Sequence, residues 1–258
     1  MNKNSKSIVV YTALFGNYDC LIDPREAYEG CDFICFTDQD NLETKIWEQV
    51  KVSQSFPSPT AANRHFKWLP HRYLDDYEVS LYLDSNILLY VDPKDLIEKY
   101  LTDADIAMPR HVLRDCLYDE ATACICLNKV GISDIYSQIV SYRRSGVPRH
   151  IGLAEQGIIL RRHNSENVIR CMETTWDELI KWGNYRDQLA FPYVAWKLSE
   201  NISLMDEYSR DYENFIHLPH TSTPDYWQKG FLLLRFIKRL CVDAQILKLL
   251  LMIKKRGY

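Results

Sequence analysis

Short, continuous apolar runs alternate along this chain with longer segments in which apolar residues recur every three or four positions. A short run bounded by turn residues is typical of a strand buried on both faces, and the longer pattern is typical of a helix with one buried side. The runs predict strands over 7–11, 33–37, 81–89, 106–108, 158–160 and 215–217. The helical spacing predicts helices over 63–73, 118–126, 133–145, 166–182 and 187–198, one more that begins at Asp92 and Pro93, and room for a short crossover helix over 19–30.

This order of short strands and helices predicts an α/β fold with one Rossmann-like sheet, mixed but mostly parallel, flanked by helices. We find no internal repeat, low-complexity segment or linker in the sequence. We therefore expect one domain over residues 1–228, followed by a C-terminal extension over 229–258.

The composition adds few constraints. Hydrophobic residues make up 47% and charged residues 26% of the 258 residues, which is typical of a soluble globular chain. The apolar start over 8–15 is short and is expected to be a strand rather than a secretory signal, so we expect a cytoplasmic protein. The eight cysteines are scattered through predicted elements, which favours reduced thiols, and none of their spacings predicts a structural zinc site.

The charge is distributed unevenly. From Lys229 onward eight basic residues stand against one acid, whereas the rest of the chain carries 23 basic and 34 acidic residues. An acidic body argues against nucleic-acid binding by the main domain. The apolar stretch over 231–253 is interrupted by charges, and its longest uncharged run is too short to span a bilayer, which needs about 20 residues. Two alternatives remain: a basic helix at the inner face of a membrane, or a helix packed on its own domain or on a second subunit.

Polar residues gather where the predicted strands end. Ligands of open α/β sheets bind beyond the carboxyl ends of the strands. The first strand leads to Thr12, Asn17, Tyr18 and Asp19, the second leads to Thr37 and Asp38, and the third leads to Asp84 and Asn86. An aspartate in such a place can simply cap the next helix, so each residue by itself is weak evidence of a ligand site.

The most informative of these strand ends is Asp84-Ser85-Asn86, inside an otherwise apolar run. A carboxylate in such a setting needs a cation or strong hydrogen-bond donors, or it becomes protonated. Two oxygen ligands at this spacing suit Mg²⁺ or Mn²⁺ bridging a diphosphate. The alternative is a polar turn inside a strand.

Seven stretches of the chain together resemble one family. They are VVYTALFGNYD (9–19), CDFICFTD (31–38), NRHFKWLPHRYL (63–74), YLDSNILL (82–89), RHVLRDCLYDEA (110–121), EQGIILRRH (155–163) and RDQLAFPYV (186–194). They are similar to the plant and bacterial glycosyltransferase-like domains that include plant mucilage-related hexosyltransferases, and YLDSN resembles the Asp-x-Asp region of A-type glycosyltransferases. The resemblance implies the A-type fold and a divalent cation, Mn²⁺ or Mg²⁺. Asn86 stands where many A-type enzymes have a second aspartate, which leaves metal dependence open.

The resemblance also implies roles for particular residues. Thr12, Ala13, Tyr18 and Asp38 would hold the base and ribose of a nucleotide sugar. Arg64 and Lys67 would face the diphosphate together with Asp84 and Asn86, unless they lie on a solvated helix face. The residues expected to contact the sugar or the acceptor are His111, Arg114, Glu120, Arg161, Arg186 and Gln188.

Two carboxylates and two histidines complete the prediction. Asp187 would lie near the anomeric carbon, either deprotonating the acceptor or stabilising an oxocarbenium-like centre, and Glu155 is the second candidate catalytic residue. Asp187 can equally be a favourable charge at a helix N-terminus. His217 and His220 resemble the late histidine that joins Asp84 and Asn86 at the metal in several A-type enzymes.

The predicted function is transfer of a hexose, from a UDP-linked or similar donor, to a glycan or lipid-linked glycan during bacterial surface polysaccharide synthesis. The bacterial setting is an expectation from the missing signal and anchor. Nucleotidyl transfer is disfavoured because the loop after the first strand has one glycine and no arginine. A non-catalytic nucleotide-sugar or glycan-binding module stays open because of Asn86.

Overall fold

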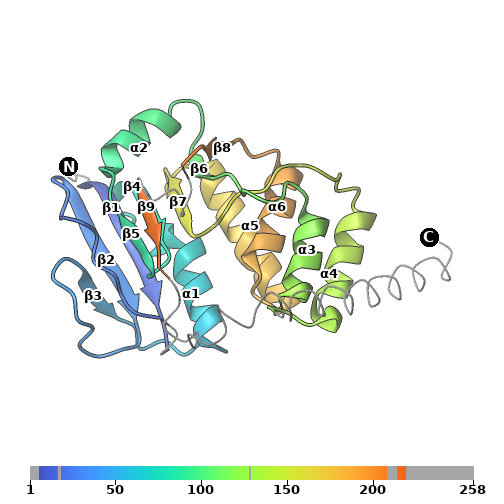
Figure 1. Cartoon of the computed structure of the whole chain (residues 1–258), viewed down its shortest axis with the longest axis horizontal. Coiled ribbons are helices and arrows are strands. Elements are labelled where there is room, and N and C mark those ends of the chain that lie inside the picture. Colours follow the sequence, from blue (N-terminus) through green and yellow to red (C-terminus); the bar gives the residue numbers. More distant parts are fainter. Residues whose placement is uncertain (1–5, 17–18, 128, 208–213, 219–258) are drawn as a thin grey trace, which may run out of the picture.

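The computed structural model describes residues 6–16, 19–127, 129–207 and 214–218. Within these ranges a seven-stranded sheet has the order β3-β2-β1-β4-β7-β6-β8 (Figure 1). Its strands are β1 (Lys6–Leu14), β2 (Cys31–Thr37), β3 (Glu48–Lys51), β4 (Tyr77–Leu83), β6 (Ile106–Pro109), β7 (Ile158–Arg161) and β8 (Ile202–Met205). A second, two-stranded sheet pairs β5 (Ile87–Leu89) with β9 (Phe215–His217).

Most of the large sheet is parallel. β1 pairs in parallel with β2 and β4, β2 with β3, and β6 with β8. β7 runs antiparallel to both of its neighbours, β4 and β6. The predicted fold class, one mixed and mostly parallel sheet flanked by helices, is confirmed.

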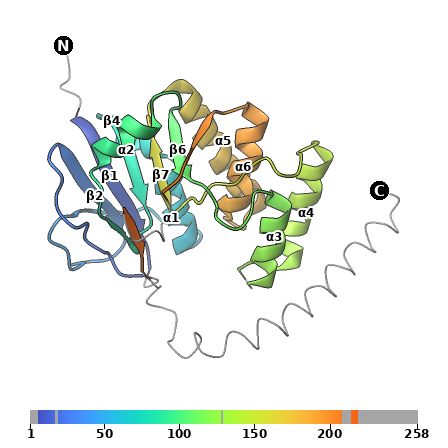
Figure 2. The same ribbon diagram turned by 45° about the horizontal axis from the view of Figure 1, so that its top comes forward.

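Helices cover the sheet unequally (Figures 1 and 2). One face packs against α1, α5 and α6, and the other packs against α2 and the small sheet, while α3 and α4 lie outside α5 and α6. The helices are α1 (Pro59–Trp68), the 3₁₀ turn η1 (Pro70–Arg72), α2 (Pro93–Tyr100), α3 (Leu117–Cys126), α4 (Ile132–Arg144), α5 (Glu166–Trp182) and α6 (Asp187–Leu198).

Alternate residues of the central strands supply the two halves of the core. Tyr11 and Tyr82 point to the α1 face, whereas Val10 and Leu81 point to the α2 face. This follows from the two-residue repeat of a strand. Burial on both faces explains why these strands are continuous apolar runs.

Most predicted elements are present, and two are wrong in an informative way. The expected crossover helix over 19–30 does not form among those residues; Ile22 and Arg25 instead donate backbone hydrogen bonds to the carbonyls of Ser85 and Leu89. The expected single strand over 81–89 is two strands in different sheets, separated by a turn in which the Ile87 N–H bonds the Asp84 carbonyl.

The strand order indicates where a ligand site lies. The chain proceeds from β1 to β2 and β3 on one side, and then returns to β4 on the other side of β1. At such a reversal the connections leave a crevice beyond the carboxyl ends of the two central strands. Gly16 follows β1 and Asp84 follows β4 at this edge.

Several predictions concern residues that the structure does not describe. Tyr18, His220 and the extension over 229–258 lie outside the described residues, as does the predicted boundary after residue 228. In the described part of the chain, every helix is too short or too polar to cross a membrane.

Candidate active site

The turn after β1 is held by the residues that follow β2. Gly16 has a left-handed backbone (φ 65°), which a glycine adopts without strain. The Gly16 N–H donates to both carboxylate oxygens of Asp38, at 2.9 and 3.2 Å, and the Gln39 amide donates to the Gly16 carbonyl at 2.6 Å. Asp38 therefore shapes the predicted nucleotide loop and remains exposed beside it.

Asp84 lies where β4 ends, next to the start of β7. Its N–H donates to the Gly157 carbonyl at 2.8 Å. A Cβ built at position 157 lies 3.1 Å from both Asp84 Oδ2 and Ile87 Cδ1, so a side chain there would press on that carboxylate. Glycine thus lets the Asp84 carboxylate lie against the β7 backbone, with 37% of its side chain exposed.

Three charged residues form a buried cluster beside Asp84. Asp187, the first residue of α6, lies 3.0 Å from Arg64 Nε and 2.8 Å from Lys67 Nζ. Lys67 Nζ also lies 3.8 Å from Asp84 Oδ1. Arg64 and Lys67 are three residues apart on α1, so both point the same way. The prediction that they face the site is consistent with this geometry, and the solvated-face alternative is wrong for Lys67, whose side chain is 2% exposed.

The cluster changes the acid–base character of its members. Burial alone would raise the pKa of the Asp187 carboxyl, but the charges of Arg64 and Lys67 outweigh it and hold that pKa well below its usual value. Burial lowers the pKa of Lys67, and Asp187 and Asp84 oppose that effect. A carboxylate with such a low pKa is a poor proton acceptor. The geometry therefore favours the charge-stabilising role for Asp187 over the deprotonating one.

Two residues missed in the sequence support Asp84. The Tyr82 hydroxyl donates to Asp84 Oδ1 at 2.9 Å, and the Asn63 amide donates to the Tyr82 hydroxyl at 3.2 Å and to the Ala13 carbonyl at 2.5 Å. Lys67 Nζ lies 5.1 Å from the Tyr82 ring centre. Tyr82 precedes Asp84 by two residues, so its position on the same face was a usable signal.

Asn86 and His217 lie together. Asn86 Nδ2 is 3.5 Å from His217 Nε2 and donates to the Leu218 carbonyl at 2.8 Å. A carboxylate, an amide oxygen and an imidazole are a donor set that fits a cation such as Mn²⁺. Among the described residues no group of three His, Cys, Asp or Glu side chains could hold a metal ion. Asp84, Asn86 and His217 thus fit a cation held jointly with a diphosphate better than a complete protein site.

The loop after β6 is fixed by its own charges. Arg114 Nε donates to the buried Glu120 at 2.5 Å, and His111 Nε2 lies 3.6 Å from the same carboxylate. His111 Nδ1 accepts from the backbone N–H of Leu113 and Arg114, at 3.2 and 3.0 Å. Burial lowers the pKa of His111, which favours the neutral ring. These three predicted sugar or acceptor residues therefore hold the loop.

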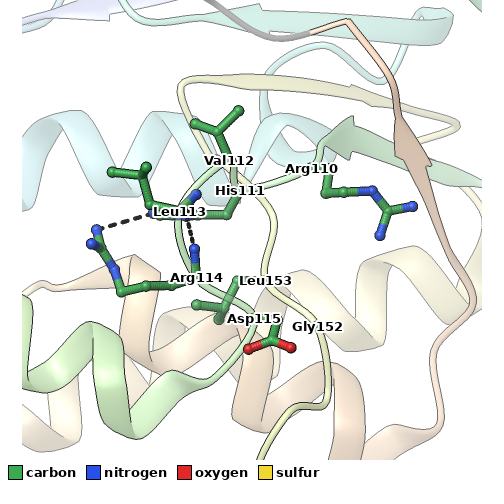
Figure 3. A pocket seen from close by; sticks show the side chains of 8 residues that line it. All are labelled: Arg110, His111, Val112, Leu113, Arg114, Asp115, Gly152 and Leu153. Atoms are coloured by element: carbon green, nitrogen blue, oxygen red, sulfur yellow. Dashed lines mark hydrogen bonds between the residues drawn. The ribbon is translucent and has the colours of Figure 1, made fainter.

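The loop borders a cavity of about 250 Å³ (Figure 3), together with Gly152 and Leu153. Leu113 is 75% exposed on this loop. A second cavity, of about 570 Å³, shares Gly152 and Leu153 and extends along α6 past Phe191 and Trp196. Both cavities adjoin the segment that leads into Gly157.

Two predicted site residues are in the core. Arg161 is fully buried, with Nη2 donating to the Lys67 carbonyl at 2.5 Å and to the Tyr11 hydroxyl, so it does not contact a sugar or acceptor directly. Thr12 is also fully buried, because β1 continues to Leu14 in register with β2 rather than ending at Tyr11. Ala13 is likewise inside the strand, and its carbonyl accepts from the Asn63 amide.

The remaining predicted residues lie around the N-terminus of α6. Gln188 Nε2 donates to the Ala154 carbonyl at 2.6 Å and so ties α6 to the segment before β7. Arg186 Nη2 lies 3.7 Å from Cys124 Sγ and helps to lower the pKa of Asp187. Glu155 is half-buried, and its N–H donates to the Pro109 carbonyl at 2.8 Å. The charge of Glu155 acts on His111, whereas Asp187 pairs with Arg64 and Lys67.

Comparison with known proteins agrees with the motifs. The family described as TOD1/MUCI70, glycosyltransferase-like domain, matches residues 1–218. This range contains all seven stretches on which the resemblance rests, and the match confirms it.

Two curated relatives are from Arabidopsis thaliana. The chain is 27% identical over 226 residues to "Probable hexosyltransferase MUCI70", across 76% of this chain and 38% of that protein. It is 25% identical over 233 residues to "Alkaline ceramidase TOD1", across 76% of this chain and 50% of that protein. The chain thus spans half or less of the length of these relatives.

Three solved structures are similar to the chain. The WbbM bifunctional glycosyltransferase matches at 12% identity and a TM-score of 0.45, over 80% of this chain and 39% of that one. Mouse xyloside xylosyltransferase 1 matches at 11% identity and 0.41, over 77% and 84%. The glycosyltransferase GlyE of Streptococcus pneumoniae matches at 14% identity and 0.42, over 79% and 46%. At these TM-scores the similarities say nothing about the site.

Proposed function

We propose that this chain, which belongs to the TOD1/MUCI70 glycosyltransferase-like family, transfers a hexose from a nucleoside diphosphate sugar to a glycan or lipid-linked glycan. The observation that carries the proposal is the charge cluster of Arg64, Lys67 and Asp187 beside Asp84, at the carboxyl edge of β1 and β4. UDP as the carrier and a role in surface polysaccharide synthesis are further parts of the proposal.

The reaction breaks the bond between the anomeric carbon and a diphosphate oxygen, and the electron pair leaves with the nucleoside diphosphate. Arg64 is the cation best placed to contact that leaving group, because 17% of its side chain is exposed. Lys67 is buried behind it and acts as a fixed positive charge. Cations preorganised in a site with little water stabilise developing negative charge strongly.

Asp84, Asn86 and His217 would hold a divalent cation if one binds. That cation would supply further stabilisation of the leaving diphosphate. Arg64 and Lys67 provide positive charge at the site in either case, so the transferase proposal does not depend on a metal.

Asp187 stabilises the positive charge that develops at the anomeric carbon, because its carboxylate stays ionised between two cations. The acceptor hydroxyl forms the new bond to that carbon and loses its proton. Glu155, half-buried before β7, is the proposed proton acceptor. We expect Asp187→Ala to preserve nucleotide affinity and to lower transfer strongly.

A donor panel tests the proposal, with release of nucleoside diphosphate as the readout and with calorimetry of nucleoside diphosphates in the presence and absence of Mn²⁺. We expect Asp84→Ala to abolish donor binding or turnover. Asp40→Ala is the control, because Asp40 is an exposed aspartate in the loop after β2, paired with Lys51. Normal transfer by the Asp84 variant would refute the site.

Other outcomes discriminate between functions. Binding without turnover, even with acceptor extracts, would favour the non-catalytic module. Absence of nucleotide binding would reject both the transferase and the non-catalytic nucleotide-sugar-binding module. Because one relative is described as an alkaline ceramidase, the panel includes ceramide, and release of a fatty acid from it would redirect the assignment to lipid hydrolysis.

A further inference from the structure

Asn86 is held by its neighbour across the small sheet. Its backbone carbonyl accepts from the Leu218 N–H at 2.9 Å, and its side-chain Nδ2 donates to the Leu218 carbonyl at 2.8 Å. The two bonds run in opposite directions between the same two residues. Asn86 is itself buried, so both bonds are shielded from water.

An aspartate cannot make the second bond. A carbonyl only accepts, and an ionised carboxylate also only accepts, so Asp at position 86 would bring two acceptors together. Leaving a buried polar group unsatisfied is destabilising. The amide that departs from the Asp-x-Asp pattern is therefore the side chain that fits the Leu218 carbonyl.

The bond between Asn86 and Leu218 lies at the end of the short strand β9. β9 has three residues, of which Phe215 is fully buried and pairs with Leu89, and His217 pairs with Ile87. Beyond His217 the contacts between Asn86 and Leu218 extend the ladder by one residue. They hold His217 at the turn that carries Asp84, with its Nε2 3.5 Å from Asn86 Nδ2.

We propose that Asn86 is a positioning residue that fastens the end of β9 to the donor site and presents His217 there. The proposal rests on the transferase function inferred above for its kinetic part. It reverses the simple expectation from the motif: Asn86→Asp, which restores the second aspartate, weakens donor binding at neutral pH instead of strengthening metal binding.

The test compares Asn86→Asp and Asn86→Ala with Asn164→Asp. Asn164 is the matched control, because its Nδ2 also donates to backbone carbonyls, those of Asp75 and Tyr77, at the far end of β4. Loss of one such bond is worth roughly 0.5–1.5 kcal/mol, so we expect the donor KM to rise about 2- to 12-fold in both Asn86 variants. The turnover number changes less, and the control keeps the wild-type KM.

Two readouts separate positioning from metal ligation. Hydrogen exchange at the Leu218 amide accelerates in both Asn86 variants. Mn²⁺ affinity, measured by calorimetry without a donor, is no higher in Asn86→Asp than in the wild type, because position 86 holds Leu218 in place instead of binding the metal.

A lower donor KM or tighter Mn²⁺ binding in Asn86→Asp at pH 7 would overturn the proposal. Faster exchange at Leu218 with an unchanged KM would also overturn it, since the bond would then be structural only. The exchange and Mn²⁺ measurements need no donor. If the wild-type protein neither binds nor turns over nucleotide sugars, the proposed transferase function is wrong. The exchange measurement still shows whether the hydrogen bonds between Asn86 and Leu218 hold the end of β9.

Discussion

Replacing Asp187 with asparagine keeps the shape of the side chain and removes its charge. In the wild-type protein this carboxylate lies 2.8 Å from Lys67 Nζ and 3.0 Å from Arg64 Nε. After the change, the nearest carboxylate to Lys67 is Asp84, at 3.8 Å. Lys67 is buried, so water cannot replace the lost partner.

The cost follows from this geometry. Removing one partner of a buried ion pair typically costs about 3–5 kcal/mol, because the other charge is left uncompensated. For a chain of this size that corresponds to a fall in Tm of roughly 6–20 °C. We expect the loss of stability to lie below the top of this range, because the amide oxygen of the variant can still accept one hydrogen bond from Lys67.

The pH dependence gives a second signature. The folded-state pKa of Asp187 is depressed below its unfolded value. Its contribution to stability is therefore present above the unfolded pKa, about 3.9, and is lost as the pH falls toward the folded value. The stability difference between wild type and variant should thus be full at pH 7 and shrink below about pH 4.

Urea denaturation of the wild type, Asp187→Asn and the double variant Lys67→Met/Asp187→Leu measures these quantities. The double variant should lose less stability than the single one, since it leaves no unpaired charge on Lys67. An Asp187→Asn protein within about 0.5 kcal/mol of wild type at pH 7 would refute the assignment of a buried cluster.

Three further predictions concern residues around the site. Gly157→Ala places a Cβ 3.1 Å from Asp84 Oδ2 and should lower turnover about tenfold or more by displacing that carboxylate; wild-type kinetics with a folded variant would contradict it. Burial lowers the pKa of His163 from 6.5 to about 4, so the unfolded chain binds more protons between these values and stability falls as the pH drops through this window. The loss, on the order of 3 kcal/mol, should disappear in His163→Gln when unfolding is followed from pH 7 to 4.5. Arg114→Met leaves buried Glu120 without its closest cation and should cost about 3 kcal/mol, whereas Arg114→Met/Glu120→Leu should recover most of it in a thermal melt.

The helices and central strands were predictable because their burial is periodic. The bounds of α5 and α6 agree with the predicted ranges, and the Asp92 side chain accepts from the Lys94 N–H at 2.9 Å, as its position before Pro93 predicts for an N-cap. The edge strands β3 and β8 were missed, because an exposed edge does not require a continuous apolar run.

The site was predictable in part. Asp84, Lys67 and Asp187 come together from three separate motifs, and the need of a carboxylate in an apolar run for a partner was a sound reason to expect this. Arg161 shows the limit of that reasoning: a charged residue next to a strand end was taken for a cleft residue, but its direction depends on register, which places it with Tyr11 in the core. The link between Asn86 and Leu218 joins residues 132 positions apart, and local sequence carries no signal of it.

The reversed direction of β7 has a consequence for how such a site can diversify. Because β7 runs against β4, the segment entering β7 arrives at the same edge as the segments leaving β1 and β4. The donor side of the site is formed by the turns at Gly16 and Asp84. Residues 110–157 are the long connection between β6 and β7, which ends at Gly157. Insertions or replacements within that connection can change which acceptor binds, while its two ends, at Pro109 and Gly157, keep their positions at the sheet. The fold thus places the donor turns and the variable connection in separate parts of the chain. Chimeras in which residues 110–153 are exchanged between relatives should keep the donor specificity and change the acceptor specificity.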